Sequence, residues 1–171
     1  DSIARLMAAD INLDGEPEII VKEDWWAAKV LIINKNGIVQ SQLNISSGNV
    51  FNLGGLRSIP SIGNFDNDSE LEIVTTVAKM LGDEEKTTVY VHNPDGTLVP
   101  GWPVNISGWQ FSSPAIGDIN KDGKQEIILG LTYNFVKPYI EPSKGGLHVF
   151  NRDGQEISGW PKFMGKCFLF S

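Results

Sequence analysis

The chain has 171 residues, of which 41% are apolar and 20% are charged, a composition typical of one globular domain or part of one. Its net charge of −7 has no basic stripe beside it, so we expect no nucleic-acid partner. No apolar stretch reaches the roughly 18 residues that span a bilayer, so we expect no membrane insertion.

The chain divides into three units, and each unit predicts four short strands. The first unit, residues 1–55, predicts strands at 2–9, 18–22 and 29–34, then an Asn-x-x-Gly turn and a fourth strand. The second unit, residues 56–109, predicts them at 56–63, 71–77 and 87–93, and the third unit, residues 110–171, at 111–117, 126–132 and 145–151. The fourth strands of the second and third units carry Gly-Trp-Pro, at 101–103 and 159–161.

This organisation predicts an all-β fold, because no segment keeps an apolar period of 3.6 residues and many short strands alternate with turns. Four strands in each repeated unit indicate the four-stranded antiparallel blades of a β-propeller. A propeller needs about four to eight blades, so we expect part of a larger propeller. A closed ring of several copies and a crescent with capped edges are the alternatives. The chain starts within a repeat, so we expect a processed or truncated product.

A nine-residue loop with oxygen-bearing side chains at positions 1, 3, 5 and 9 follows the first strand of each unit. The three loops start 54 residues apart, at Asp10, Asn64 and Asp118. Calcium takes six to eight oxygen ligands, and position 7 would add its backbone carbonyl. The sequence therefore predicts up to three calcium sites. Their ligands are Asp10, Asn12, Asp14, Glu16 and Glu18; Asn64, Asp66, Asp68, Glu70 and Glu72; and Asp118, Asn120, Asp122, Lys124 and Glu126.

Two other interpretations of these loops compete with the calcium sites. An EF-hand requires a glutamate at position 12 and a following helix, whereas position 12 here is Val21, Thr75 or Leu129 and a strand-like run follows. The second alternative is three acidic surface turns without a metal. Three copies in register, each with three carboxylates, favour metal binding, and three bound calcium ions would neutralise most of the net charge.

The second loop departs from the other two, which have glycine at position 6 where the chain turns through a positive φ. It has Asn64 at position 1, Asp66 at position 3 and Ser69 at position 6. A serine forced to a positive φ is strained by about 1 kcal/mol. We therefore predict that the second site is the weakest of the three.

The face opposite the calcium loops is expected to carry the variable segments 22–29, 78–86 and 132–146, and loops on a rigid scaffold often bind ligands. Their aromatic side chains suit stacking on a sugar or anchoring a protein, and the alternative role is packing. These candidate ligand-binding residues are Trp25, Trp26, Tyr133, Phe135 and Tyr139. Trp102 and Trp160 recur in Gly-Trp-Pro, so we expect them to lie between blades.

The pattern Asp-x-Asn-x-Asp-Gly-x-x-Glu, preceded by Pro-(Ala/Ser)-Ile-Gly and followed by a strand, resembles the FG-GAP repeat. Residues 116–130 are a close match, and Gly-Trp-Pro after an Asn-x-Asp-Gly turn also recurs in prokaryotic members. The family includes the integrin alpha-subunit propeller and many secreted proteins with VCBS-type repeats. The resemblance implies four-stranded blades with calcium in the first loop of each blade. Family members usually have aspartate at position 9, where this chain has glutamate throughout.

The sequence favours a non-catalytic, calcium-binding propeller module of a secreted or cell-surface protein. Its expected role is adhesion, with a protein or glycan ligand on the face opposite the loops and further blades from the same or another chain. The alternative functions are a propeller scaffold of a calcium-dependent polysaccharide lyase or other carbohydrate-active enzyme, and a structural spacer. No G-x-S-x-G elbow, H-E-x-x-H segment or phosphate-binding glycine loop is present. His92 and His148 are expected to be ordinary strand residues.

Overall fold

A computed structural model describes residues 4–23, 29–45, 58–66, 68–81, 84–110, 112–133 and 144–166. These residues form strands and turns, and none of them lies in an α-helix. The expectation of an all-β chain is therefore confirmed. Within the described ranges, no helix is long and apolar enough to cross a membrane.

The strands form three antiparallel sheets, which we call blades 1, 2 and 3 in chain order. Blade 1 contains β1 (Ala4–Ala9), β2 (Glu18–Glu23), β3 (Lys29–Ile33) and β4 (Val39–Asn44). Blade 2 contains β5 (Ser61–Gly63), β6 (Glu72–Leu81), β7 (Glu84–His92) and β8 (Val104–Ser107). Blade 3 contains β9 (Trp109–Gln110), β10 (Ala115–Gly117), β11 (Glu126–Tyr133), β12 (Lys144–Phe150) and β13 (Lys162–Lys166).

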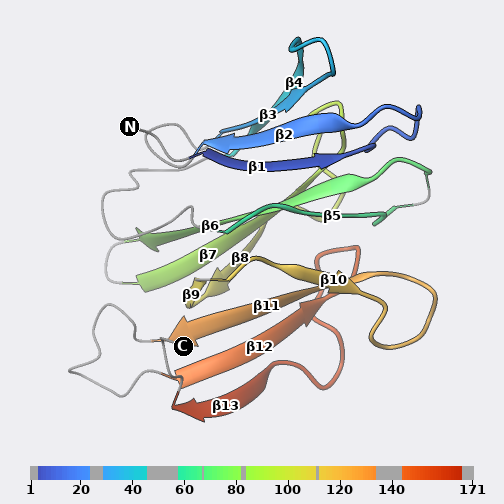
Figure 1. Cartoon of the computed structure of the whole chain (residues 1–171). Helices are drawn as coiled ribbons and strands as arrows, with labels where there is room; N and C mark the ends of the chain where they lie inside the picture. Colours follow the sequence, from blue (N-terminus) through green and yellow to red (C-terminus); the bar gives the residue numbers. More distant parts are fainter. Residues whose placement is uncertain are drawn as a thin grey trace.

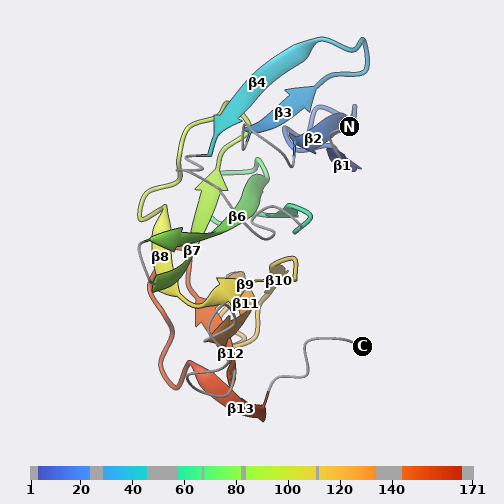
Figure 2. The ribbon, with the colours of Figure 1, turned by 90° about the vertical axis from the view of Figure 1, so that its left-hand side faces the viewer.

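In blades 1 and 2 the strands follow one another in sequence order, and β10 to β13 do so in blade 3. The short β9 pairs with β11 beyond the N-terminal end of β10. Figure 1 shows the three sheets side by side, with blade 2 between blades 1 and 3. Figure 2 shows that they form a curved array. This arrangement is consistent with propeller blades, and the described strands do not close into a ring.

Two apolar clusters hold the array together, one on each face of blade 2. In β6, Ile73 and Val77 pack against the blade 1 side chains Ile20 and Val30. Val74 points to the opposite face and joins the cluster that blade 2 shares with blade 3. Successive side chains of a strand point to opposite faces, so the β-branched run in β6 supplies both interfaces.

Tight turns connect the third and fourth strands of each blade, as the Asn-x-x-Gly pattern predicts. The amide of the glycine, Gly37, Gly96 or Gly154, donates to the carbonyl of the asparagine three residues earlier at 2.9 to 3.1 Å. The three glycines have φ angles of 78°, 92° and 75°, the left-handed region that favours glycine. The predicted turn and its left-handed residue are therefore confirmed.

Polar contacts add to the packing between blades. The indole Nε1 of Trp102 donates to the carbonyl of Arg152 in blade 3 at 2.9 Å, and its ring meets Phe150 edge-on. Gly101 lies so close to the backbone of Asp153 that an added Cβ would come within 2.4 Å of its carbonyl oxygen. Trp102 therefore lies between blades, as expected, and its glycine neighbour permits the close approach.

Between blades 1 and 2, the buried side chain of Lys22 crosses the interface. Its Nζ donates to the Ser58 carbonyl at 2.8 Å and to the Ser58 hydroxyl at 3.1 Å. The Ser58 hydroxyl also contacts the hydroxyl of Thr76 at 2.8 Å. A buried ammonium group requires such oxygen partners, so this contact fixes blade 1 against blade 2.

Three expectations about the strands need correction. Residues 78–86 were expected to form a variable loop, but β6 and β7 stay paired as far as Leu81 and Glu84, because alternate side chains such as Ala78 still reach the core. Gly-Trp-Pro lies immediately before β8 and β13 and not within them. Trp109, which the predicted boundary placed in blade 2, is buried and pairs with Thr132 of blade 3.

We predict that Trp102→Phe lowers the free energy of unfolding by about 2 kcal/mol, because it leaves the Arg152 carbonyl without its donor and a gap between blades 2 and 3. Urea denaturation followed by circular dichroism measures this change. Trp160→Phe is the matched control, since Trp160 is only half-buried and its loss should have a smaller effect. Equal losses for the two variants would contradict the inter-blade role of Trp102.

Candidate metal sites

Each of the three candidate metal loops connects two neighbouring strands at the start of its blade. They join β1 to β2, β5 to β6 and β10 to β11, and Figure 1 shows them along one side of the array. Each loop begins where the first strand ends, and position 9 is the first residue of the next strand. Position 9 is therefore held by strand pairing, while positions 1 to 8 form the turn.

In the first loop, backbone amides fold the loop around its side-chain oxygens. Asp10 accepts hydrogen bonds from the amides of Asp14 and Gly15 at 3.1 and 2.9 Å, and Asp14 accepts one from Glu16 at 2.8 Å. The side-chain amide of Asn12 donates to Asp14 at 3.3 Å and to Glu18 at 3.5 Å. The side chains at positions 1, 3, 5 and 9 are thus joined in one network.

The third loop repeats this geometry closely. Asp118 accepts from the amides of Asp122 and Gly123 at 3.1 and 2.9 Å, and Asn120 donates to Asp122 at 3.1 Å. Glu126 accepts from the amide of Ile119 at 3.0 Å. In both loops an asparagine amide therefore donates to the aspartate at position 5 and offsets part of the repulsion among the carboxylates.

The second loop has a different arrangement, because its aspartate and asparagine exchange positions 1 and 3. Asn64 donates its side-chain amide to the backbone carbonyl of Asp68 at 2.8 Å. Asp66, Asp68 and Glu72 each offer a carboxylate oxygen, and these three oxygens lie within 4.8 Å of one another. Three converging anionic oxygens form a group that could hold a metal ion.

Glu72 is fully buried, and one of its oxygens is satisfied while the other is not. The amide of Phe65 donates to Oε2, whereas Oε1 has no hydrogen-bond partner. Burial, followed by the charges of Asp66 and Asp68, raises the pKa of Glu72 to about 7, although the Phe65 amide acts in the opposite direction. A buried carboxylate oxygen without a donor is costly, and a cation between the three acids would compensate it.

The donor sets fit a hard divalent cation such as calcium. All the side-chain donors are oxygens, and with the carbonyl of position 7 each loop offers five ligand residues, which reach the six to eight oxygens of calcium when a carboxylate binds through both oxygens or water is added. The side chain at position 7 is directed elsewhere in the first loop, where Glu16 forms a 3.0 Å ion pair with Lys35. That position 7 contributes only its carbonyl stays a prediction.

The strain argument against the second loop is wrong. Gly15 and Gly123 do have positive φ angles, 91° and 86°, but Ser69 does not. The non-glycine residues with positive φ among those described are Leu13 and Lys121, at position 4, which the sequence patterns did not single out. The prediction that the second site is the weakest thus loses its strain argument, and the relative affinity of the three sites stays a prediction.

Of the five candidate ligand-binding aromatics, only Tyr133 lies within the described residues. Trp25, Trp26, Phe135 and Tyr139 lie outside them. The half-buried ring of Tyr133 contacts Phe163 at 5.9 Å between ring centres, and its hydroxyl is hydrogen-bonded to Nε2 of His148. Burial and the charge of Glu156 raise the pKa of this phenol. The contacts of Tyr133 are those of a packed residue, and its ligand-binding role stays a prediction.

The two histidines are buried strand residues in equivalent stacks. His92 stacks on Tyr90 at 5.9 Å, and His148 stacks on Phe150 at 6.1 Å between ring centres. His92 occupies the repeat position of Phe150, and His148 that of Tyr90, so the order of the two rings is reversed between blades 2 and 3. Burial lowers the pKa of His92. His148 differs, because its Nδ1 donates to Glu156 at 2.6 Å.

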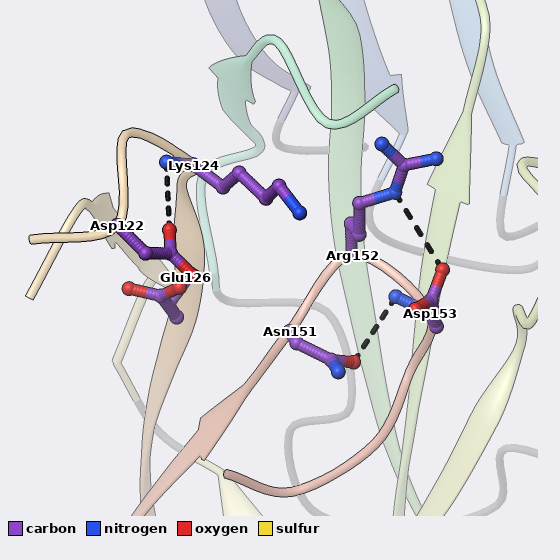
Figure 3. Close-up of a pocket in the computed structure, with 6 residues that line it drawn as sticks. All are labelled: Asp122, Lys124, Glu126, Asn151, Arg152 and Asp153. Carbon is purple, nitrogen blue, oxygen red and sulfur yellow. Dashed lines mark hydrogen bonds and ion pairs between the residues drawn. The ribbon is translucent and has the colours of Figure 1, made fainter. Parts of the chain in front are cut away.

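A hollow of about 420 Å³ adjoins the second candidate metal loop, and one of about 410 Å³ adjoins the third. They share Arg152 and Asp153 of the turn between β12 and β13. Figure 3 shows the hollow beside the third loop, which is lined by Asp122, Lys124, Glu126, Asn151, Arg152 and Asp153. Sequence reasoning missed this feature, because the loop and the turn that form it lie far apart in the chain.

Comparison with known families matches residues 64–129 to the FG-GAP-like repeat. The matched segment starts at position 1 of the second metal loop and ends in β11, so it includes the second and third loops. A comparison with curated proteins finds no match. The resemblance inferred from the sequence is therefore confirmed through this segment.

We predict that Glu72 makes the metal-free protein less stable as the pH rises. Its pKa is raised from 4.5 to about 7 in the folded state, so the folded chain holds an extra proton between these values. The contribution of Glu72 to the free energy of unfolding is fully present below pH 4.5 and is lost as the pH rises through 7. Glu72→Gln should remove this pH dependence, which changes the free energy of unfolding of the wild type by at most about 3 kcal/mol.

Urea denaturation in excess chelator at pH 5 and pH 8 measures this difference. The wild type should lose more stability than Glu72→Gln over that range. Glu84→Gln is the control, because Glu84 is exposed and lies at the far end of blade 2 from the loop. If Glu72→Gln and the wild type follow the same pH profile, Glu72 does not carry the extra proton.

Proposed function

We propose that this FG-GAP-like repeat protein is a non-catalytic β-propeller module that binds calcium in the first loop of each blade. The observation that carries the proposal is the second loop, where oxygens of three carboxylates lie within 4.8 Å of one another and one oxygen of the buried Glu72 has no hydrogen-bond partner. The networks at positions 1, 3, 5 and 9 of the first and third loops support the same assignment.

Calcium acts as a structural ion in this proposal. Without a cation, each loop must keep three carboxylates together, and in the first and third loops an asparagine amide offsets their repulsion only in part. Position 9 begins a central strand of its blade, so the bound ion would connect the loop to the β-sheet. A ligand present at 100 times its dissociation constant adds about 2.7 kcal/mol to the free energy of unfolding.

The module is proposed to act in adhesion, in a secreted or cell-surface protein. Extracellular calcium is abundant enough to fill sites of modest affinity, and the single cysteine leaves folding independent of an internal disulfide. The blades provide a rigid scaffold, on which loops can hold a protein or glycan ligand. Further blades, from the same or another chain, would cover the faces that blades 1 and 3 direct away from blade 2.

We predict that calcium raises the melting temperature above the value in chelator by about 5 to 10 °C for each occupied site, and that magnesium does not. Differential scanning calorimetry in millimolar calcium, in millimolar magnesium and in excess chelator makes the comparison. Asp14→Asn should remove about one third of the calcium-dependent rise, because it removes one ligand of the first site.

Glu84→Gln is the control, since it removes an equal charge from an exposed position in β7 whose contact is a surface ion pair with Lys86. It should leave the full calcium-dependent rise. A melting temperature that is the same in calcium and in chelator would refute the metal sites. A rise that Asp14→Asn and Glu84→Gln reduce equally would mean that calcium acts through general charge screening.

A further inference from the structure

In blades 1 and 3, two positions of the repeat face each other beside the candidate metal loop. They are position 7 of the loop and the second residue of the turn between the third and fourth strands. In blade 1 they are Glu16 and Lys35, whose side chains form an ion pair at 3.0 Å. The equivalent residues in blade 3 are Lys124 and Arg152, so the same place holds two positive charges.

The two cations of blade 3 lie on opposite walls of the 410 Å³ hollow. Figure 3 shows the side chain of Lys124 extending across it towards Arg152. The backbone of Arg152 is fixed by the hydrogen bond from Trp102, and its Nε lies 3.6 Å from Asp153. The loop thus places Lys124, and the inter-blade contact of Trp102 places Arg152.

Two like charges that face each other repel, and an anion between them turns that repulsion into attraction on both sides. The walls of the hollow also contain the carboxylates of Asp122, Glu126 and Asp153, which leave an excess of one negative charge. A divalent cation in the third loop reverses this excess. The hollow is therefore suited to an anion when the loop holds its metal, and this inference rests on the proposed function.

We propose that this hollow binds the carboxylate of an acidic sugar. Guanidinium and ammonium groups are the natural partners of a carboxylate, and the planar fork of arginine matches its two oxygens. All six lining residues are polar or charged, which suits a ligand with many hydroxyl groups better than an apolar peptide side chain. The volume lies within the range of small-molecule sites.

The neighbouring hollow shows what distinguishes this one. It shares Arg152 and Asp153 but is lined in addition by Phe65, Val99 and Pro100, and it offers no second cation. In blade 2 the two equivalent positions are Glu70 and Pro94, which supply no positive charge. The pairing of two cations is therefore a property of blade 3 among the three blades.

The test is a titration of the calcium-saturated chain with glucuronate, followed by the NMR signal of the Trp102 indole N–H. This group donates to the Arg152 carbonyl and so reports on the turn that carries Arg152. Glucose tests the need for the carboxylate, and acetate and inorganic phosphate test the need for the sugar. We expect a saturable shift with glucuronate and much weaker effects of the other three.

Arg152→Glu places an acid opposite Lys124 and so restores the opposite charges of blade 1. It should weaken glucuronate binding by about 10- to 100-fold, the usual effect of losing a charged hydrogen bond. Arg152→Gln is the milder variant if the first does not fold. Lys162→Glu, on an exposed residue outside the hollow, is the matched control and should bind as the wild type does.

The calcium-dependent rise in melting temperature, measured on the same samples, separates the two proposals. If that rise is absent, the metal sites fail. If it is present and glucuronate causes no shift, only the sugar-acid site fails. If glucose binds as tightly as glucuronate, the cations do not recognise a carboxylate. If acetate or phosphate binds as tightly as glucuronate, the hollow does not recognise a sugar.

Discussion

The hydrogen bond from the amide of position 2 to the glutamate of position 9 is the contact on which each blade depends. It occurs in all three loops, from Ile11 to Glu18, from Phe65 to Glu72 and from Ile119 to Glu126. The glutamates are almost fully buried, at 3%, 0% and 1% exposure. One buried carboxyl group thus closes the loop and starts the next strand.

The same contact connects the loop with the packing of the next blade. The side chain of Ile11 joins the cluster between blades 1 and 2, and its carbonyl accepts from the amide of Leu71 at 2.8 Å. The side chain of Phe65 joins the cluster between blades 2 and 3. In blades 1 and 2, position 2 therefore contributes its amide to the candidate metal loop and its side chain to the blade interface. In an array whose stability comes largely from neighbour contacts, this residue would couple the proposed metal binding to blade packing.

The sequence predicted the features that local chemistry decides. The 54-residue spacing, the strand runs and the Asn-x-x-Gly turns each depend on neighbouring residues, and the structure has them where the pattern indicated. The exceptions are the first strands of blades 2 and 3, which were predicted at 56–63 and 111–117 and are shorter, at Ser61–Gly63 and Ala115–Gly117. Other features depend on residues far apart in the chain. The extension of β6 and β7 to Leu81 and Glu84 requires cross-strand pairing, and the hollow beside the third loop requires Lys124 and Arg152 to meet. The positive φ of Leu13 follows from the closure of its loop, which side-chain type alone does not reveal.

The repeat separates the positions that build the blade from those that can change its surface. Positions 1, 3, 5 and 9 face into the loop, and their replacement disturbs its hydrogen bonds. Position 7 contributes its backbone to the loop, so its side chain is free to be glutamate in blade 1 and lysine in blade 3. The second residue of the following turn has the same freedom, because only the asparagine and the glycine fix that turn. Since both variable side chains lie beside the proposed metal, an unchanged framework can offer an ion pair in one blade and a hollow lined by two cations in another.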